Sequence, residues 1–65
     1  MPVLLTTRDA ARVLALSPRT LERLRLSGDG PRYCKLRRSV RYRQADLDAW
    51  LASNAVASTS EARHG

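Results

Sequence analysis

Cysteine and histidine are almost absent from this sequence of 65 residues, and phenylalanine is missing altogether. The single cysteine, Cys34, excludes an internal disulfide and a cysteine-based metal site. The single histidine, His64, is next to the last residue, so no imidazole lies in the organised part of the chain to activate Cys34 as a nucleophile. We therefore expect Cys34 to be a small apolar structural residue, and we expect no bound metal.

Long hydrophobic runs are also missing. No apolar run, Val3–Leu5 included, is long enough for a membrane span or for the core of a signal peptide. A chain of this length buries only about 60% of the surface that its unfolded form exposes, which leaves no room for a substrate pocket beside a core. We expect one small domain that is not an enzyme, takes no cofactor or small-molecule ligand and does not span a membrane.

The charge balance is strongly basic. Twelve Lys and Arg residues stand against six Asp and Glu residues, which gives a net charge of +6 and a pI near 11.1, and eleven of the twelve cations are arginine. Between Ser17 and Arg43, nine cations are opposed only by Glu22 and Asp29, so this stretch alone carries +7. Arginine forks match phosphates and guanine edges. The composition favours a nucleic acid, an anionic membrane surface or an acidic protein as the partner.

A first helix is predicted over Thr6–Ala15. Thr6 and Asp9 have the spacing of a capping box, with Thr6 as the N-cap. An apolar stripe follows at helical spacing and consists of Ala10, Ala11 and Leu14, with Val13 as a further candidate.

A second helix is predicted over residues 17–27. Ser17 is a strong N-cap, Pro18 suits the first helical position, and Gly28 is a typical left-handed C-cap. Leu21 and Leu24 are expected to face the core. Because only Leu16 separates this helix from the first, the two must turn sharply, which is the geometry of a helix-turn-helix.

A basic β-hairpin and a third helix complete the predicted domain. The strands are Arg32–Leu36 and Val40–Arg43, and the helix runs over Gln44–Ser53. Tyr42 and an apolar helix face are expected in the core; the face comprises Leu47, Trp50 and Leu51. The fold class is therefore mainly α with a small β-hairpin, a winged helix-turn-helix of three helices plus a two-stranded wing. We assign residues 1–53 to this domain and residues 54–65 to a disordered polar tail.

Five short motifs follow one another along the chain: Leu5-Thr6 with Ala11 and Leu14, Ser17–Leu21, Ser27–Pro31, Val40–Tyr42 and Asp46–Leu51. In this order and spacing they resemble the excisionase and AlpA-like branch of the MerR-type DNA-binding domains. The resemblance covers about residues 4–52. It implies a small phage or integrative-element protein that binds DNA beside a recombination site and assists a tyrosine recombinase (integrase) in excision, or regulates integrase genes. The sequence departs from the family pattern at Arg37, where glycine is common, and at Leu24, where Trp or Tyr is common.

The second helix and the hairpin carry the predicted DNA contacts, with the helix in the major groove and the basic wing, residues 32–43, on the backbone or in the minor groove. The residues predicted to bind DNA are Ser17, Arg19, Thr20, Arg23, Arg25, Arg37, Arg38 and Arg41. In the alternative, the residues of the helix form only a solvated face, and the arginines of the hairpin only protect a strand edge against aggregation. Glu22 is expected to pair with Arg19 or Arg25 on its own helix, with a cytosine contact as the alternative.

Three functions remain open at this level. The first is an architectural DNA-binding excisionase that acts with a tyrosine recombinase and associates side by side with further copies on DNA. The second is a small prophage-type transcription regulator, and the third is a basic module that binds an acidic protein. In each of the DNA-binding roles the partner is double-stranded DNA and not a membrane, and we expect a cytoplasmic, nucleoid-associated protein.

Overall fold

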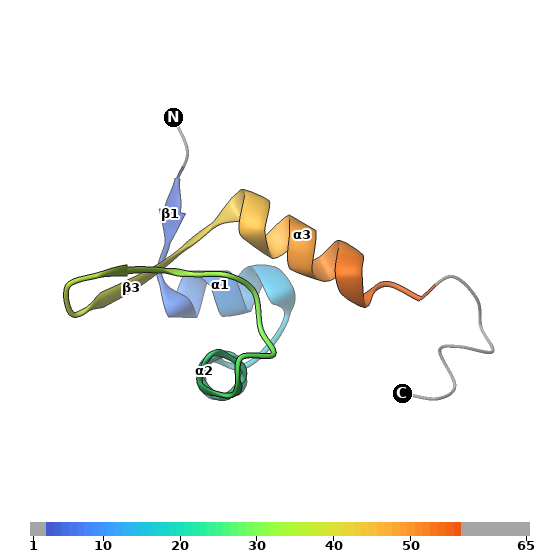
Figure 1. Ribbon diagram of the computed structural model, residues 1–65, viewed down its shortest axis with the longest axis horizontal. Helices are drawn as coiled ribbons and strands as arrows, with labels where there is room; N and C mark the ends of the chain where they lie inside the picture. Colours follow the sequence, from blue (N-terminus) through green and yellow to red (C-terminus); the bar gives the residue numbers. More distant parts are fainter. Residues whose placement is uncertain (1–2, 57–65) are drawn as a thin grey trace.

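The computed structural model of the chain describes residues 3–56. They form, in chain order, β1 (Leu4–Leu5), α1 (Thr7–Leu14), α2 (Pro18–Ser27), β2 (Cys34–Leu36), β3 (Ser39–Arg43) and α3 (Gln44–Asn54). The hairpin of β2 and β3 extends to one side, α3 extends to the other, and α2 lies below them, seen end-on (Figure 1). The predicted winged helix-turn-helix is confirmed, with α3 ending one residue later than expected. Residues 57–65 of the predicted tail lie outside the described residues.

Helix α1 begins and ends as its sequence predicts. The Thr6 hydroxyl accepts a hydrogen bond from the Asp9 backbone N–H at 3.1 Å, which satisfies one of the free donors at the helix start. The helix stops at Ala15, which has a left-handed φ of 58°. The small apolar stripe is buried, whereas Val13 is 46% exposed and does not belong to it.

Helix α2 has both of its predicted caps. The Ser17 hydroxyl accepts a hydrogen bond from the Thr20 backbone N–H at 3.1 Å, Pro18 occupies the first turn, and Gly28 closes the helix with a φ of 81°. Leu21 is completely buried and Leu24 is half-buried. The two helices are therefore joined by a turn of Ala15, Leu16 and Ser17, as a helix-turn-helix requires.

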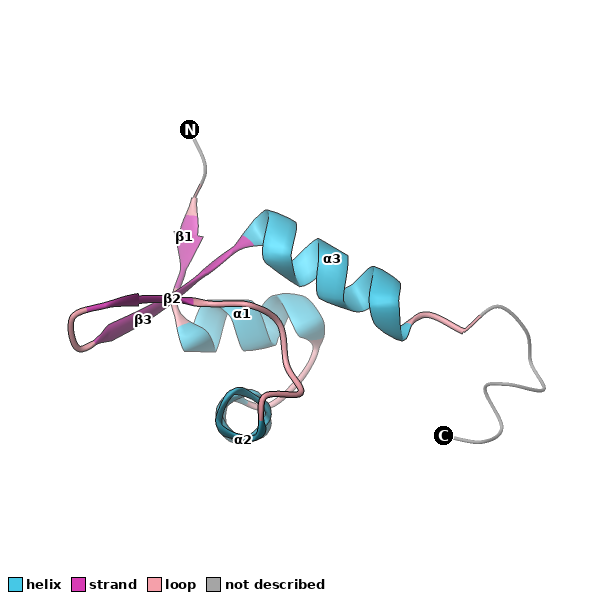
Figure 2. Cartoon of the chain, in the orientation of Figure 1, coloured by secondary structure: helices cyan, strands magenta, loops and turns pink. Residues whose placement is uncertain are grey.

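The sheet has one strand more than the sequence predicted. β3 lies between β1 and β2, and both pairings are antiparallel (Figure 2). Leu5 of β1 is opposite Tyr42, and Leu36 of β2 is opposite Ser39, so the hairpin turn consists of Arg37 and Arg38 alone. The prediction of a two-stranded wing was therefore correct for the hairpin but missed β1, which joins its base.

The register decides which face of the hairpin is buried. Residues directly opposite each other in an antiparallel pair point to the same face. Cys34 is opposite Arg41, and Lys35 is opposite Val40, which packs against the core. Cys34 therefore lies on the outer face of the sheet, with Leu36, which is 49% exposed.

Helix α3 follows β3 without a linker, because Arg43 is both the last strand residue and the N-cap. Leu47 is completely buried, as expected. Trp50 is only half-buried, and its indole N–H donates to the Asp29 carbonyl at 2.9 Å, which ties α3 to the loop after α2. Leu51 was expected in the core, but it is 43% exposed because α3 extends beyond the other elements (Figure 1).

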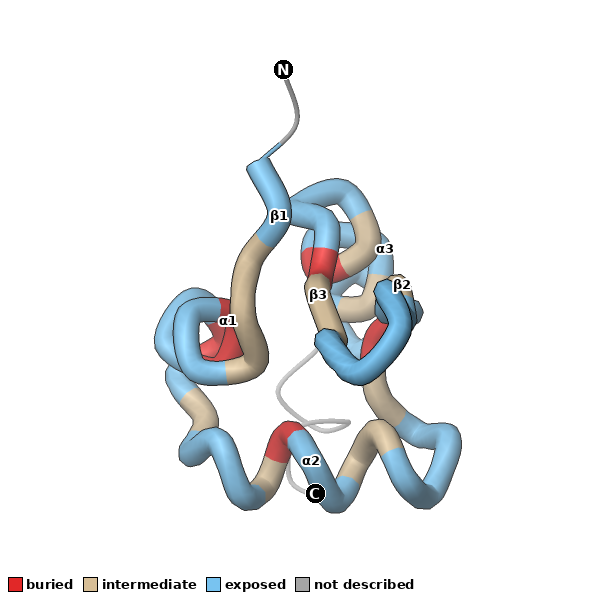
Figure 3. The backbone as a smooth tube through the Cα atoms, turned by 90° about the vertical axis from the view of Figure 1, so that its left-hand side faces the viewer, coloured by how far each residue is buried: buried red, intermediate tan, exposed pale blue. Residues whose placement is uncertain are grey.

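The core lies where α1, α2, β3 and α3 meet. Figure 3 shows the buried segments of α1, α2 and β3 in red, on the sides of these elements that are turned toward one another. The buried apolar residues are Ala10, Ala11, Leu14, Leu21, Tyr42 and Leu47, with Leu5, Leu16, Val40 and Trp50 packed against them. This small core fixes the orientation of α2 relative to the hairpin.

Candidate nucleic-acid interface

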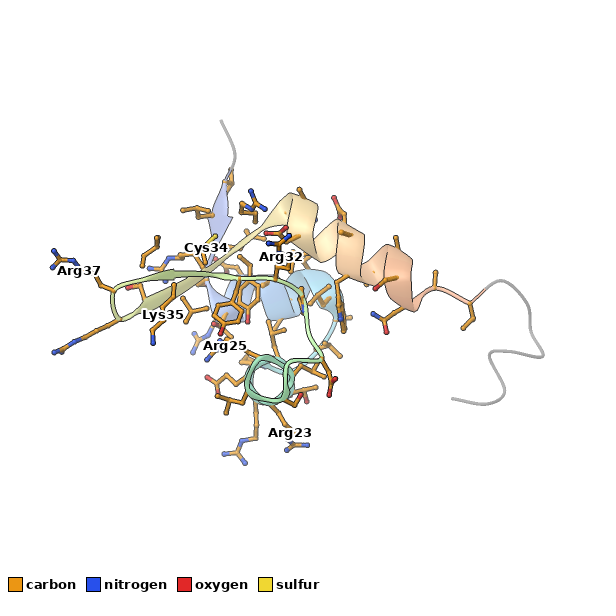
Figure 4. All side chains as sticks on the ribbon, in the orientation of Figure 1. Arg23, Arg25, Arg32, Cys34, Lys35 and Arg37 are labelled. Atoms are coloured by element: carbon orange, nitrogen blue, oxygen red, sulfur yellow. The ribbon has the colours of Figure 1, made fainter. Side chains whose placement is uncertain are left out.

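One face of α2 points away from the core. Arg19, Glu22, Arg23 and Leu26 recur at spacings of three and four residues, so they share one side of the helix, and all four are exposed. Arg23 extends from α2 away from the body of the domain (Figure 4). Leu21 is buried on the opposite side. The two predicted arginines of α2 are thus presented together, and Leu26, which was not among the predicted contact residues, joins them.

Ser17 and Thr20 form the first turn of α2. Beyond the capping bond, the Ser17 hydroxyl donates to the Thr20 hydroxyl at 2.8 Å. Ser17 is exposed and Thr20 is half-buried. Both hydroxyls therefore have a structural role in starting the helix, at the end where Arg19 is presented.

The hairpin presents a second group of cations. Arg37 and Arg38 are exposed and form its turn, and Arg37 has a left-handed φ of 61°. Figure 4 shows Arg37 at the far end of the hairpin and Lys35 on the side toward α2. Arg41, which was also predicted to bind DNA, is half-buried in β3, and its Nη1 donates to the Val40 carbonyl at 2.8 Å.

Arg25 is positioned differently from the other arginines of α2. It is half-buried, and its Nη1 donates to the Thr7 hydroxyl at 3.2 Å and to the Tyr42 hydroxyl at 3.3 Å. Its guanidinium carbon lies 5.8 Å from the centroid of the Tyr33 ring. Arg25 therefore links α2 to α1 and to β3. Sequence spacing alone did not distinguish it from an exposed arginine, because its partners come from distant parts of the chain.

Acidic side chains leave this basic surface largely unneutralised. Within residues 3–56, one ion pair has a nitrogen–oxygen distance of 4.0 Å or less. It joins Arg43 Nε to Asp46 Oδ2 at 2.7 Å. The hydrogen bond from Arg43 lowers the pKa of Asp46 and raises the pKa of Arg43. The expected pairing of Glu22 with Arg19 or Arg25 is absent from the described part of the chain. Arg19, Arg23, Lys35, Arg37 and Arg38 are thus exposed without an acidic partner there.

Metal-binding and membrane-spanning features are both absent from the same residues. No group of three metal-ligating side chains comes together within residues 3–56. No helix among them is both long and apolar enough to cross a bilayer.

The architecture agrees with a known family of domains. A protein-family model described as "Helix-turn-helix domain" matches residues 4–55, which include every helix and strand of the structure. A comparison with curated proteins finds no match.

Proposed function

Because this chain belongs to the helix-turn-helix domain family, a family of DNA-binding domains, we propose that it binds duplex DNA with α2 in the major groove and the β2–β3 hairpin on the flanking backbone or in the minor groove. The observation that carries this proposal is the pairing of two exposed basic surfaces. Arg19 and Arg23 are on the outward face of α2, and Arg37 and Arg38 are at the hairpin tip.

The two surfaces have different chemical tasks. Arg19 and Arg23 can each offer a bidentate fork to the O6 and N7 atoms of guanine, which supplies sequence selectivity. Arg37 and Arg38 supply charge to phosphates, which supplies affinity but no sequence information. Ser17 and Thr20 hold the start of α2. Arg25, which we also predicted to contact DNA, acts in this proposal mainly by positioning α2, because its Nη1 donates to hydroxyls of α1 and β3. Arg41 stays a predicted DNA contact, because its Nη1 donates only to the carbonyl of the adjacent Val40.

We further propose that the protein is an architectural excisionase. One recognition helix and one wing read few base pairs and bury only about 600–1,000 Å². Such a module gains affinity when several copies lie side by side on adjacent sites. Helix α3 ends at Asn54 and extended backbone follows at Ala55, so the described residues contain no long dimerisation helix. Together with the resemblance to excisionases, this supports a factor that coats the DNA beside a recombination site and assists a tyrosine recombinase.

Electrophoretic mobility shift on duplex DNA at near-physiological salt tests the DNA-binding proposal. A shift at or below micromolar protein is expected, and selection from a random duplex pool should enrich one motif. No shift at micromolar protein would overturn the proposal and favour a basic module that binds an acidic protein.

Footprinting over the attachment-site DNA of the source element separates the finer roles. An extended footprint with a regular repeat is expected for the excisionase. A single isolated footprint over a promoter would instead identify a transcription regulator with the same domain.

Arg23→Ala tests base recognition directly. Loss of a bidentate guanine contact should weaken binding to the selected site by about 1–3 kcal/mol and relax the preference at one base pair. Arg12→Ala is the matched control, because Arg12 is an exposed arginine in the last turn of α1 and belongs to neither proposed DNA-binding surface. If Arg23→Ala weakens binding to selected and random duplexes equally, Arg23 contacts a phosphate and base readout by this residue is refuted.

A further inference from the structure

Leu26 lies on the same outward face as the recognition arginines. It is 85% exposed, more than any other large apolar side chain in the described residues. Single exposed leucines are common on protein surfaces and by themselves indicate nothing. Leu26 differs through its neighbours, because it follows Arg19 by seven residues and Arg23 by three, and the helix period brings all three to one side.

We propose that Leu26 contacts the 5-methyl group of a thymine and makes the DNA site selective for thymine at that position. The inference rests on the proposed binding of α2 in the major groove. Thymine presents its methyl group in that groove, and among the four unmodified bases only thymine offers an apolar group there. A leucine side chain, which has no hydrogen-bonding group, matches this feature and no other base edge.

The position of Leu26 along α2 also predicts where the thymine lies. An α-helix rises about 1.5 Å per residue, so Leu26 is about 4.5 Å further along the axis than Arg23. Successive base pairs are about 3.4 Å apart. The thymine should therefore be one or two base pairs from the base that Arg23 contacts, on the side away from Arg19.

Replacement of thymine by uracil tests this inference, because it removes the methyl group and keeps every hydrogen-bonding atom of the base edge. Each thymine of the selected duplex is replaced in turn by deoxyuridine, and Kd is measured for the parent protein and for Leu26→Ala. At one position, uracil should weaken binding of the parent about fourfold, which is the effect expected for one methyl group lost from an apolar contact.

Leu26→Ala should bind the thymine and uracil duplexes equally well, and about as weakly as the parent binds uracil. The matched control is Leu51→Ala, which truncates an exposed leucine on α3 and should retain the parent's discrimination. Because Leu26 is so exposed, its variant should unfold at the parent's temperature.

Two negative results distinguish a failure of this inference from a failure of the proposed function. If the parent binds its selected duplex but no thymine shows a methyl effect that depends on Leu26, the inference is wrong and the proposed DNA binding stands. If no duplex is bound at all, the proposed function itself fails.

Discussion

At the scale of single residues, backbone strain marks Arg37. Two non-glycine residues of the described chain have left-handed backbones, Ala15 with φ 58° and Arg37 with φ 61°. Such a conformation costs a residue with a Cβ about 1–2 kcal/mol. Glycine would avoid this cost. Arginine at the hairpin tip therefore lowers the stability of the fold and adds a positive charge there, which is consistent with a contact to phosphate.

Arg37→Gly should stabilise the fold and weaken DNA binding at the same time. Relief of strain is partly offset by the larger entropy of glycine in the unfolded chain, so we expect a gain of about 0.5–1 kcal/mol in urea unfolding. Loss of one phosphate contact should lower the slope of log K against log salt by about 0.9. Ala15→Gly is the control, since it relieves similar strain and should leave the slope unchanged. Stabilisation without a change of slope would show that Arg37 does not contact the backbone of DNA.

The ion pair of Arg43 and Asp46 predicts a dependence of stability on pH. The pKa of Asp46 is lowered in the folded protein from its usual value of 3.8. The contribution is therefore fully present above about pH 4 and is lost as pH falls through the folded pKa. Thermal unfolding between pH 6 and pH 2 should show a smaller decrease of Tm for Asp46→Asn than for the parent. Asp48→Asn is the control substitution, because the Asp48 carboxylate accepts its hydrogen bond from Gln44 and not from an arginine. An equal decrease of Tm for the parent and for Asp46→Asn over this pH range would contradict the prediction.

At the scale of elements, Arg25 connects α2 to α1 and to β3. Arg25→Met keeps a long side chain but removes the donor for the Tyr42 hydroxyl, which belongs to a completely buried residue. A buried polar group left without its partner costs about 1–3 kcal/mol, so chemical denaturation should show a loss of that size. The salt slope of DNA binding should not change. A slope that falls by about 0.9 with stability intact would return Arg25 to the set of phosphate contacts.

The sequence predicted the elements whose signals are local. Thr6, Ser17 and Gly28 indicate the limits of α1 and α2, because caps act within a few residues of the helix end. β1 has two residues and exists only through its pairing with β3, so nothing in Leu4–Leu5 indicates it. For the candidate site, helical spacing was enough to place Arg19 and Arg23 on one face.

Side-chain partners that are distant in sequence could not be predicted. The position of Arg25 depends on Thr7 and Tyr42, which reach it only after the chain has folded. Leu51 fits the apolar spacing of α3 as well as Trp50 does. It is exposed because the core ends before the helix does, and spacing along one helix contains no information about the extent of its neighbours.

At the scale of the whole molecule, the unpaired cations set the response to salt. Five exposed cations without an acidic partner in residues 3–56 lie on α2 and the hairpin, the two elements proposed to bind DNA: Arg19, Arg23, Lys35, Arg37 and Arg38. Arg19 and Arg23 are assigned to guanine edges, so Lys35, Arg37 and Arg38 remain for phosphates. With about 0.9 of slope for each phosphate neutralised, log K should fall against log salt with a slope of about −3. Changing Arg37 and Arg38 together to Gln should reduce it by about 2 and keep the preferred sequence. A slope near −1 for the parent would be incompatible with an interface that includes both surfaces.

The direct junction of β3 and α3 restricts how this protein can vary in length during evolution. Each residue added to an α-helix rotates the remainder of that helix by about 100°, because a turn has 3.6 residues. One residue inserted between Arg43 and Gln44 would swing Leu47 out of the core and separate Trp50 from Asp29. The Arg37–Arg38 turn has no such constraint, because both of its residues are exposed. Among homologues, insertions and deletions should therefore occur at the hairpin tip and be absent at the start of α3.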